Sequence, residues 1–339
     1  MKKKIISVLA IILLLSLTGF SDYKESNGRY IVSALGFKDN GSTVTALAQI
    51  LTVNESSADE QVVSRVFTGE GKSCKEAVSK LSKTLTKPVV FDHCNVILCN
   101  TAIKKKRLYE VLSFVRSDKS VNLAIYVALC ENPAEILSTG SDFSAASGFD
   151  LVRIEDNLKD ETGLTFDNRY YKIEKAQNRI TQDFSLPVFE IKDNSIALSS
   201  LTAFSKGAKR LNISSDRGIY LSILKNGFSG GRINGTETTV NKCHTTCSFK
   251  EQNGRLKVNI KSYITVENTD ESFIKDIKNG VKDFLLWLKS QNAGDIIGIK
   301  ERLKNKNGAL YEKYKDINIL TDAEINYEIK AVLNSGKYE

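Results

Sequence analysis

The sequence predicts a multi-domain α+β protein, made of mixed α/β units in which helices cover mixed or antiparallel sheets. Short apolar or alternating runs, typical of strands, recur along the chain, and helical segments separate several of them. One long amphipathic helix is expected at 270–291, close to the C-terminus. The length of 339 residues suffices for two or three domains, each with its own core.

The N-terminus has the pattern of a secretory signal. Three lysines at 2–4 precede an apolar run at 5–17, and small or polar residues such as Gly19 and Ser21 follow. The apolar run is shorter than the roughly 20 residues that a spanning helix needs. The alternative is a buried N-terminal core helix. Export is the prediction, with residues 1–20 as a signal or anchor segment.

Strands and helices alternate in the N-terminal half. Apolar runs at 30–37 and 43–50 flank an Asn40-Gly41 turn, which predicts a hairpin. The stretch 138–165 is rich in Ser, Gly, Asp and Asn, and is predicted to be a loop or a domain junction. Between them we expect helices that begin at Ser73, Arg107 and Pro133, and strands at 89–98 and 123–130.

The C-terminal half is rich in predicted strands until its long helix. Apolar positions of the helix at 270–291 recur every three or four residues, so it should cover one face of a sheet. Its lysines also allow a membrane-binding alternative. The tail, 300–339, is mostly polar and charged. A short helix is expected at 169–181, and strands are expected at 188–191, 196–198, 201–204, 218–224, 255–260 and 263–266.

We therefore expect three parts along the chain. After the signal or anchor segment, residues 21–185 form an N-terminal α/β region with room for two subdomains. Residues 186–339 form a C-terminal α/β domain.

The charge balance argues against nucleic acid as a partner. The net charge is +8, from 48 basic and 40 acidic residues, and three of the basic residues are the lysines at 2–4. A surplus this mild does not indicate nucleic-acid binding, but it suits a protein near an anionic lipid surface.

The cysteines and histidines predict no metal site. An even count of six cysteines in an exported protein permits disulfides, but the spacing matches no known framework, so most are expected to be buried apolar residues. A Cys243–Cys247 disulfide is the alternative. A zinc site could be drawn from the residues His93, Cys94, Cys243, His244 and Cys247. Their spacing matches no standard zinc finger or zinc ribbon, so no zinc site is predicted.

No catalytic or cofactor-binding constellation is present in the sequence. The glycine-rich stretch 227–231 has neither a P-loop ending nor dinucleotide-fingerprint spacing. Gly-x-Ser-x-Gly and His-Glu-x-x-His patterns are missing, and Asp156 and Asp160 are interpreted as solvated charges. The sequence predicts a protein that is not an enzyme and has no catalytic, cofactor-binding or metal-binding residues. A secreted hydrolase would need a constellation that the sequence hides.

The order of several segments resembles a known family. The signal is followed by a strand at 31–37, a helix at 73–85 and the run Phe91-Asp92-His93-Cys94-Asn95-Val96-Ile97-Leu98, and the long helix precedes Gly294-Asp295-Ile296-Ile297-Gly298-Ile299. This arrangement resembles the C-subunit family of GerA-type spore germination receptors, written Ger(x)C, over nearly the whole chain. The resemblance implies a lipoprotein on the outer face of the spore inner membrane. It also implies partners, namely integral membrane A- and B-type subunits, and no catalysis.

The sequence departs from this family at the lipid attachment site. Phe20 occupies the position of the usual lipobox cysteine, and diacylglycerol attachment needs the thiol. No lipidation is therefore expected, and either the apolar run stays as an anchor or partner subunits hold the cleaved protein. We expect an exported, membrane-associated protein on the outer face of the cytoplasmic (spore inner) membrane.

The resulting functional hypothesis is a non-catalytic C subunit of a nutrient germinant receptor, needed for receptor assembly and for triggering spore germination. The alternative is an extracytoplasmic small-molecule-binding protein. His93 is interpreted as a hydrogen-bonded residue at a strand edge, with a partner contact as the alternative.

Overall fold

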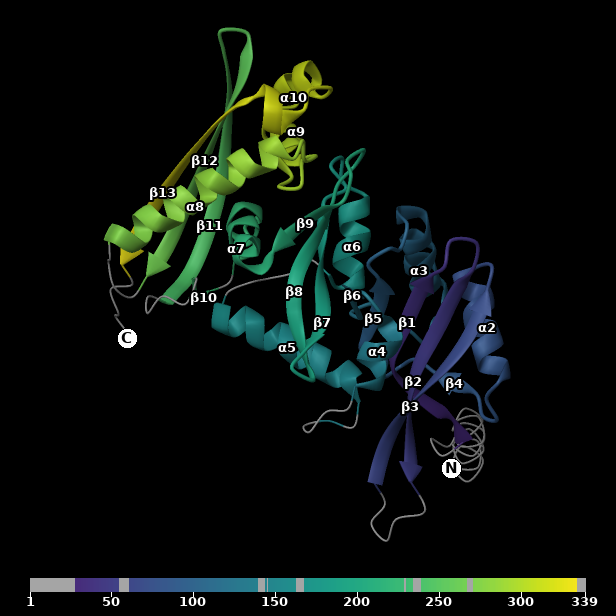
Figure 1. Ribbon diagram of the computed structural model, residues 1–339. Helices are drawn as coiled ribbons and strands as arrows, with labels where there is room; N and C mark the ends of the chain where they lie inside the picture. Colours follow the sequence, from purple (N-terminus) through teal and green to yellow (C-terminus); the bar gives the residue numbers. More distant parts are fainter. Residues whose placement is uncertain are drawn as a thin grey trace, which may run out of the picture.

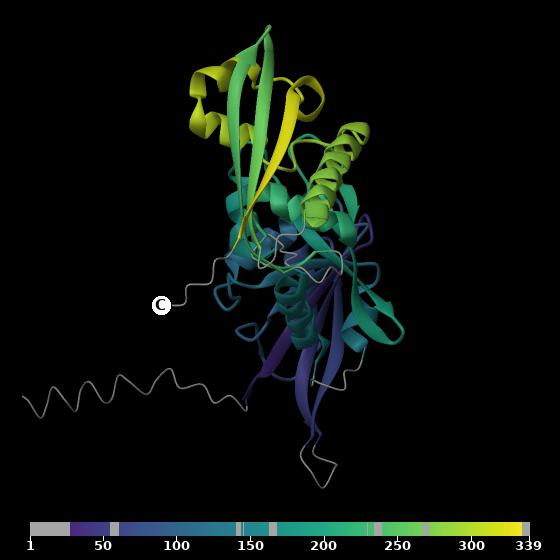
Figure 2. The same cartoon turned by 90° about the vertical axis from the view of Figure 1, so that its left-hand side faces the viewer.

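Two β-sheets with their covering helices make up the computed structural model, as the sequence predicts for an α+β protein (Figure 1). It describes residues 28–54, 61–139, 144, 146–162, 168–228, 230–233, 239–266 and 271–333. The four-stranded sheet stands at one end of the molecule and the nine-stranded sheet at the other (Figure 2).

The nine-stranded sheet is mixed. Its strand order is β3-β2-β1-β5-β6-β7-β8-β9, with β4 paired to β1. The central strands β1, β5, β6 and β7 are parallel, and antiparallel pairs flank them on both sides. The strands are β1 (Tyr30–Asp39), β2 (Val44–Asn54), β3 (Gln61–Gly71), β4 (Val89–Val90), β5 (Val96–Asn100), β6 (Tyr126–Cys130), β7 (Phe184–Lys192), β8 (Ser195–Phe204) and β9 (Leu211–Ser214).

The hairpin predicted around Asn40-Gly41 is confirmed. Asp39 pairs with Val44, and Gly41 has a φ of 88°, which glycine adopts without steric cost. The single strand predicted at 89–98 is wrong, because the chain turns between β4 and β5. The Cys94 amide donates to the Phe91 carbonyl at 2.9 Å and closes that turn.

Helices cover both faces of the nine-stranded sheet. On one face the buried side chains of β1, β2 and β5 pack with α2 (Cys74–Lys83), α3 (Lys105–Ser117) and α6 (Tyr170–Gln177). On the other face they pack with α4 (Pro133–Ser138) and α5 (Ser147–Thr162). Burial on both faces explains why the central parallel strands are continuous apolar runs.

The helix α5 corrects the prediction of a loop at 138–165. Leu151 is fully buried, and Ile154 and Leu158 pack at its side at helical spacing. The polar composition of this segment hides a narrow apolar stripe, which is sufficient to hold a helix on a sheet.

The four-stranded sheet has the order β10-β11-β12-β13, in which only β13 runs parallel to its neighbour. Its strands are β10 (Gly231–Arg232), β11 (Thr239–Gln252), β12 (Arg255–Val266) and β13 (Glu324–Leu333). The helices of this part are α7 (Ser215–Lys225), α8 (Glu271–Ser290), α9 (Ile299–Lys306), α10 (Gly308–Tyr314) and α11 (Ile319–Asp322).

The long helix predicted at 270–291 is confirmed as α8. Its buried stripe joins the core over β11 and β12, and consists of Phe273, Ile277, Val281, Phe284 and Leu288. Only Leu286 among its large apolar residues is strongly exposed, at 65%. The helix therefore covers the sheet, as its periodicity predicts.

One other prediction in this half is wrong. The segment 218–224 lies in helix α7 and is not a strand. A short, continuous apolar run has no periodicity, so the sequence pattern does not distinguish a buried strand from a buried helix. Asn226, at φ 65°, ends α7 in the left-handed conformation that commonly terminates helices. The polar tail also contains ordered structure, because Tyr327 and Ile329 of β13 face the core.

The domain boundary expected between residues 185 and 186 falls inside β7, and the first sheet continues to β9. The division into domains remains a prediction. The signal or anchor segment lies outside the described residues. Among the residues that the structure describes, no helix has the length and apolar character needed to cross a membrane.

Candidate functional site

The structure separates the residues from which a zinc site could be drawn. His93 is exposed in the turn after β4, whereas Cys94 is buried beside it. On β11, His244 is exposed and Cys243 and Cys247 point into the core. Within the described ranges, no group of three or more His, Cys, Asp or Glu residues could hold a metal ion.

All six cysteines are buried free thiols. Burial raises the pKa of Cys94 to about 12 and that of Cys243 to about 11. A thiol with such a pKa carries little thiolate at neutral pH and is a poor nucleophile. The interpretation of these residues as buried apolar side chains is confirmed, and the Cys243–Cys247 disulfide is not formed.

The other sequence candidates form no site among the residues that the structure describes. Gly227 follows the end of α7, and Gly231 begins β10, so the glycine-rich stretch connects a helix to a strand. Asp156 accepts a hydrogen bond from the Tyr126 hydroxyl at 3.4 Å, and the side chain of Asp160 lies outside the described part of the chain.

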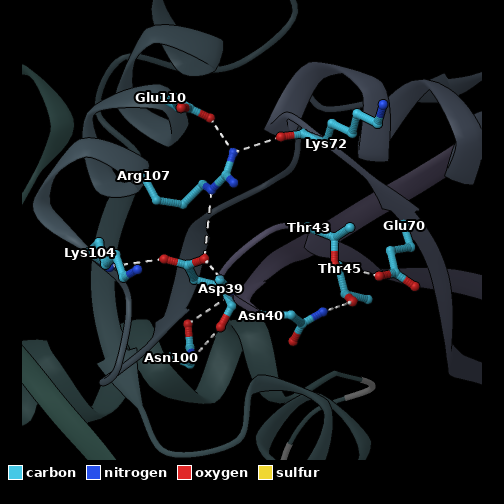
Figure 3. A network of polar contacts seen from close by, with 11 residues as sticks. Asp39, Asn40, Thr43, Thr45, Glu70, Lys72, Asn100, Lys104, Arg107 and Glu110 are labelled. Atoms are coloured by element: carbon cyan, nitrogen blue, oxygen red, sulfur yellow. Dashed lines mark hydrogen bonds and ion pairs between the residues drawn. The ribbon is translucent and has the colours of Figure 1, made fainter.

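A polar network lies where the parallel strands β1 and β5 end (Figure 3). The side chain of Asp39 is 3% exposed, and its carboxylate lies 3.8 Å from Arg107 Nε. The carboxylate also accepts from the Gly41 amide at 3.0 Å and the Lys104 amide at 3.1 Å. Asn100 accepts from the Asp39 amide at 2.8 Å. In open α/β sheets this edge commonly holds ligands, but here its polar groups bind one another.

The turn between β8 and β9 reaches over this edge. Arg210 donates to the Thr101 carbonyl at 3.0 Å, and Lys105 Nζ donates to the Ser205 carbonyl at 3.4 Å. The guanidinium of Arg210 also lies 5.4 Å from the centroid of the Phe204 ring. These contacts fix the basic turn 206–210 beside the loops of the first sheet.

The segment Gly294-Asp295-Ile296-Ile297-Gly298-Ile299 lies at the junction of the two sheets. It links α8 to α9, and Gly294 lies against Ser205 and Ala208 of the β8–β9 turn. Asp295 accepts from the amides of Ile299 at 2.9 Å and Lys300 at 2.7 Å, and so caps α9. Burial raises the pKa of the Asp295 carboxyl above its ordinary value of 3.8, and nearby Asp183 raises it further. Gly298 has a φ of 75°, which requires a residue that tolerates the left-handed region.

The same junction holds a buried ion pair. Asp183, just before β7, is 1% exposed, and its carboxylate lies 3.0 Å from Lys225 Nζ at the end of α7. Glu301 of α9 accepts from the Ile180 amide at 3.0 Å. The two sheets are therefore connected by charged and polar contacts that favour one relative placement.

A cleft of about 920 Å³ opens beside this junction. The β8–β9 turn forms one wall, the chain between α8 and α9 forms another, and the chain from α10 to α11 forms a third. Its lining consists of residues 180–181, 206–211, 291–295, 300, 311 and 315–319.

The cleft is basic. It is lined by five cationic side chains, Lys206, Lys209, Arg210, Lys300 and Lys315, against the two carboxylates Asp295 and Asp316. No sequence pattern predicts this cleft as a site. The signal that could have found it is the run Lys206-Gly207-Ala208-Lys209-Arg210 between two predicted strands, but the other walls come from segments remote in sequence.

The structure defines an α+β protein with two mixed sheets and a basic cleft, and comparison with known proteins gives its family. A family model described as the spore germination protein N-terminal domain matches residues 22–191, half of the chain. The chain belongs to the Ger(x)C family of spore germination proteins.

One curated relative supports this membership, and one solved structure has a similar fold. The chain is 20% identical over 221 residues to the spore germination protein GerQC of Bacillus cereus. That match covers 62% of this chain and 61% of GerQC, so this chain spans less than two thirds of the length of GerQC. The fold is similar to the crystal structure of the GerBC protein, with a TM-score of 0.53 at 16% identity over 89% of this chain and 97% of the other.

Proposed function

We propose that this chain is the C subunit of a nutrient germinant receptor, and that it acts by assembly and signalling rather than by catalysis. The observation that carries the proposal is the family match over residues 22–191 together with a fold similar to GerBC across 89% of the chain. An assembly and signalling subunit needs no catalytic residues. The described polar clusters, around Asp39 and around Asp183, are closed by internal partners.

The proposal places the protein on the outer face of the spore inner membrane, bound to integral A- and B-type subunits. Phe20 replaces the lipobox cysteine, so a lipid cannot be attached at this position. Attachment to the membrane then depends on the N-terminal apolar run, on the partner subunits, or on both. His93 is exposed in the turn after β4 and is available for a partner contact.

Co-purification from spore membranes tests this assignment. A C-terminally tagged chain should be recovered with both membrane subunits from detergent extracts. In a strain that lacks those subunits, a Phe20→Cys variant provides the matched control, because a restored lipobox can anchor the chain without partners. Recovery of the chain from wild-type membranes without either membrane subunit would contradict the proposal.

The alternative, an extracytoplasmic small-molecule-binding protein, is favoured by one observation, the cleft of about 920 Å³. Pockets for small molecules commonly measure about 300–1,000 Å³. A free binding protein would be recovered without membrane partners, and a metabolite would raise its unfolding temperature. The same co-purification experiment therefore separates the two functions.

A further inference from the structure

The basic cleft contains charges that the fold does not use. Lys206 and Lys209 are exposed in the β8–β9 turn, and within the described ranges neither forms an ion pair with a carboxylate. Surface lysines alone are ordinary. These two, however, lie on the wall of a large concave site, where their fields add to those of the cations on the other walls.

The other cations of the cleft are held in place by backbone groups. Lys300 Nζ donates to the Lys315 carbonyl at 2.7 Å, and Arg210 donates to the Thr101 carbonyl at 3.0 Å. An ammonium group has three donors, so Lys300 keeps two for a ligand. Carbonyl partners position these side chains without neutralising their charge.

The acidic residues of the cleft are fewer than its cationic residues, two against five. Both oxygens of Asp295 accept backbone amides of α9, at 2.9 and 2.7 Å, which holds this carboxylate on the helix. Lys315 is paired with Glu312 at 2.9 Å, on the exposed surface of α10 and its end. Asp316 is exposed. The net field inside the cleft is therefore positive.

The geometry points to a binding site for a phosphate-bearing ligand in this cleft, with Lys206, Lys209 and Lys300 as the groups that contact it. Ammonium groups are compact point charges that bind phosphate oxygens well. Four of the five cationic groups in the cleft are ammonium groups, and the single guanidinium, of Arg210, already donates to the Thr101 carbonyl and lies beside the Phe204 ring. The phosphate can belong to a soluble phosphate ester or to a phospholipid headgroup.

This inference goes beyond the proposed receptor role and does not depend on it, because binding is measured on the purified full chain in dodecyl maltoside. Titration with inorganic pyrophosphate, followed by calorimetry at low salt, measures the soluble source. Thermal unfolding in mixed micelles measures the lipid source, with phosphatidylglycerol compared to phosphatidylcholine. The test variant is Lys206→Gln/Lys209→Gln. The control variant, Lys75→Gln/Lys83→Gln, removes two exposed charges from α2, outside the cleft.

We expect saturable binding of pyrophosphate with a Kd below about 1 mM, or a rise in unfolding temperature with phosphatidylglycerol only. The test variant should weaken pyrophosphate binding by at least about tenfold, or abolish the lipid-dependent rise. The control variant should stay within about twofold of the unmodified chain. Pyrophosphate binding assigns a soluble ester, and a response to phosphatidylglycerol alone assigns a lipid headgroup. The inference is overturned if neither probe binds, or if both variants lose binding equally.

Discussion

Gln49 of β2 is expected to hold the helices α4 and α5 against the first sheet. Its side chain is fully buried. Its Nε2 donates to the Leu137 carbonyl at 2.7 Å and to Ser147 Oγ at 2.9 Å. Its Oε1 accepts from the Gly148 amide at 3.1 Å and from Ser33 Oγ at 2.9 Å. One amide thus joins two strands to the end of α4 and the start of α5.

Replacing Gln49 by leucine keeps the side-chain volume similar and removes all four hydrogen bonds. Two backbone groups, the Leu137 carbonyl and the Gly148 amide, lose this buried partner, at about 1–3 kcal/mol each. Burial of the leucine offsets about 1–2 kcal/mol of that loss. The free energy of unfolding should therefore fall by about 3 kcal/mol, a large share of the 5–15 kcal/mol that is typical of a folded domain.

Urea denaturation followed by circular dichroism measures this change. The midpoint should move to lower urea while the slope stays constant, because the surface exposed on unfolding is unchanged. Gln252→Leu, at the exposed end of β11, is the matched control and should stay within about 0.5 kcal/mol of the unmodified chain. A loss below about 1 kcal/mol for Gln49→Leu would refute the role assigned to this residue.

Three further predictions concern stability and reactivity. Burial raises the pKa of Glu155 from its ordinary value of 4.5 to about 8, so its contribution to stability is complete below pH 4.5 and is lost as the pH rises through 8. Between pH 5 and pH 8.5 the unmodified chain should therefore lose free energy of unfolding, by about 1.4 kcal/mol for each unit of pKa shift. In urea denaturation at these two pH values, Glu155→Gln should lose less free energy of unfolding than the unmodified chain. An equal loss in the two proteins would contradict this prediction. The buried thiols, including Cys94 and Cys243, should react with Ellman's reagent at pH 8 only after denaturation, when six thiols become accessible, and fast labelling of the native protein would be inconsistent with their burial. Gly69→Ala should lower the free energy of unfolding by about 1–3 kcal/mol, because the new Cβ would lie 2.4 Å from the Leu81 amide nitrogen of α2. Gly308→Ala is the control and should not destabilise the protein, because no atom lies within 4 Å of the new Cβ. Equal effects of the two substitutions would refute the steric argument.

Local patterns predict the elements whose signals are local. The β1–β2 hairpin follows from apolar runs around Asn40-Gly41, and α8 follows from an apolar stripe that extends from Phe273 to Leu288. The segment 218–224 is predicted as a strand but forms a helix. All of its residues except Tyr220 are buried, so the sequence shows no polar positions whose spacing would indicate a helix.

Other elements depend on contacts between remote segments. Strand β13 pairs in parallel with β12, and Lys257 faces Glu324 across 67 positions of sequence. The alternation of Ile325, Tyr327 and Ile329 was present in the sequence, but its charged neighbours concealed it. The cleft likewise needs three segments that only tertiary packing brings together. The basic turn 206–210 can be recognised in the sequence, but the cleft that it lines cannot be predicted from it.

Nutrient-triggered germination of spores that lack this gene tests the receptor-subunit assignment most directly. Loss of refractility reports germination, and a non-nutrient trigger checks that the spores can still germinate. The assignment predicts that these spores fail to respond to at least one class of nutrient, respond normally to the non-nutrient trigger, and recover when the gene is restored. Normal germination with every nutrient tried would contradict it.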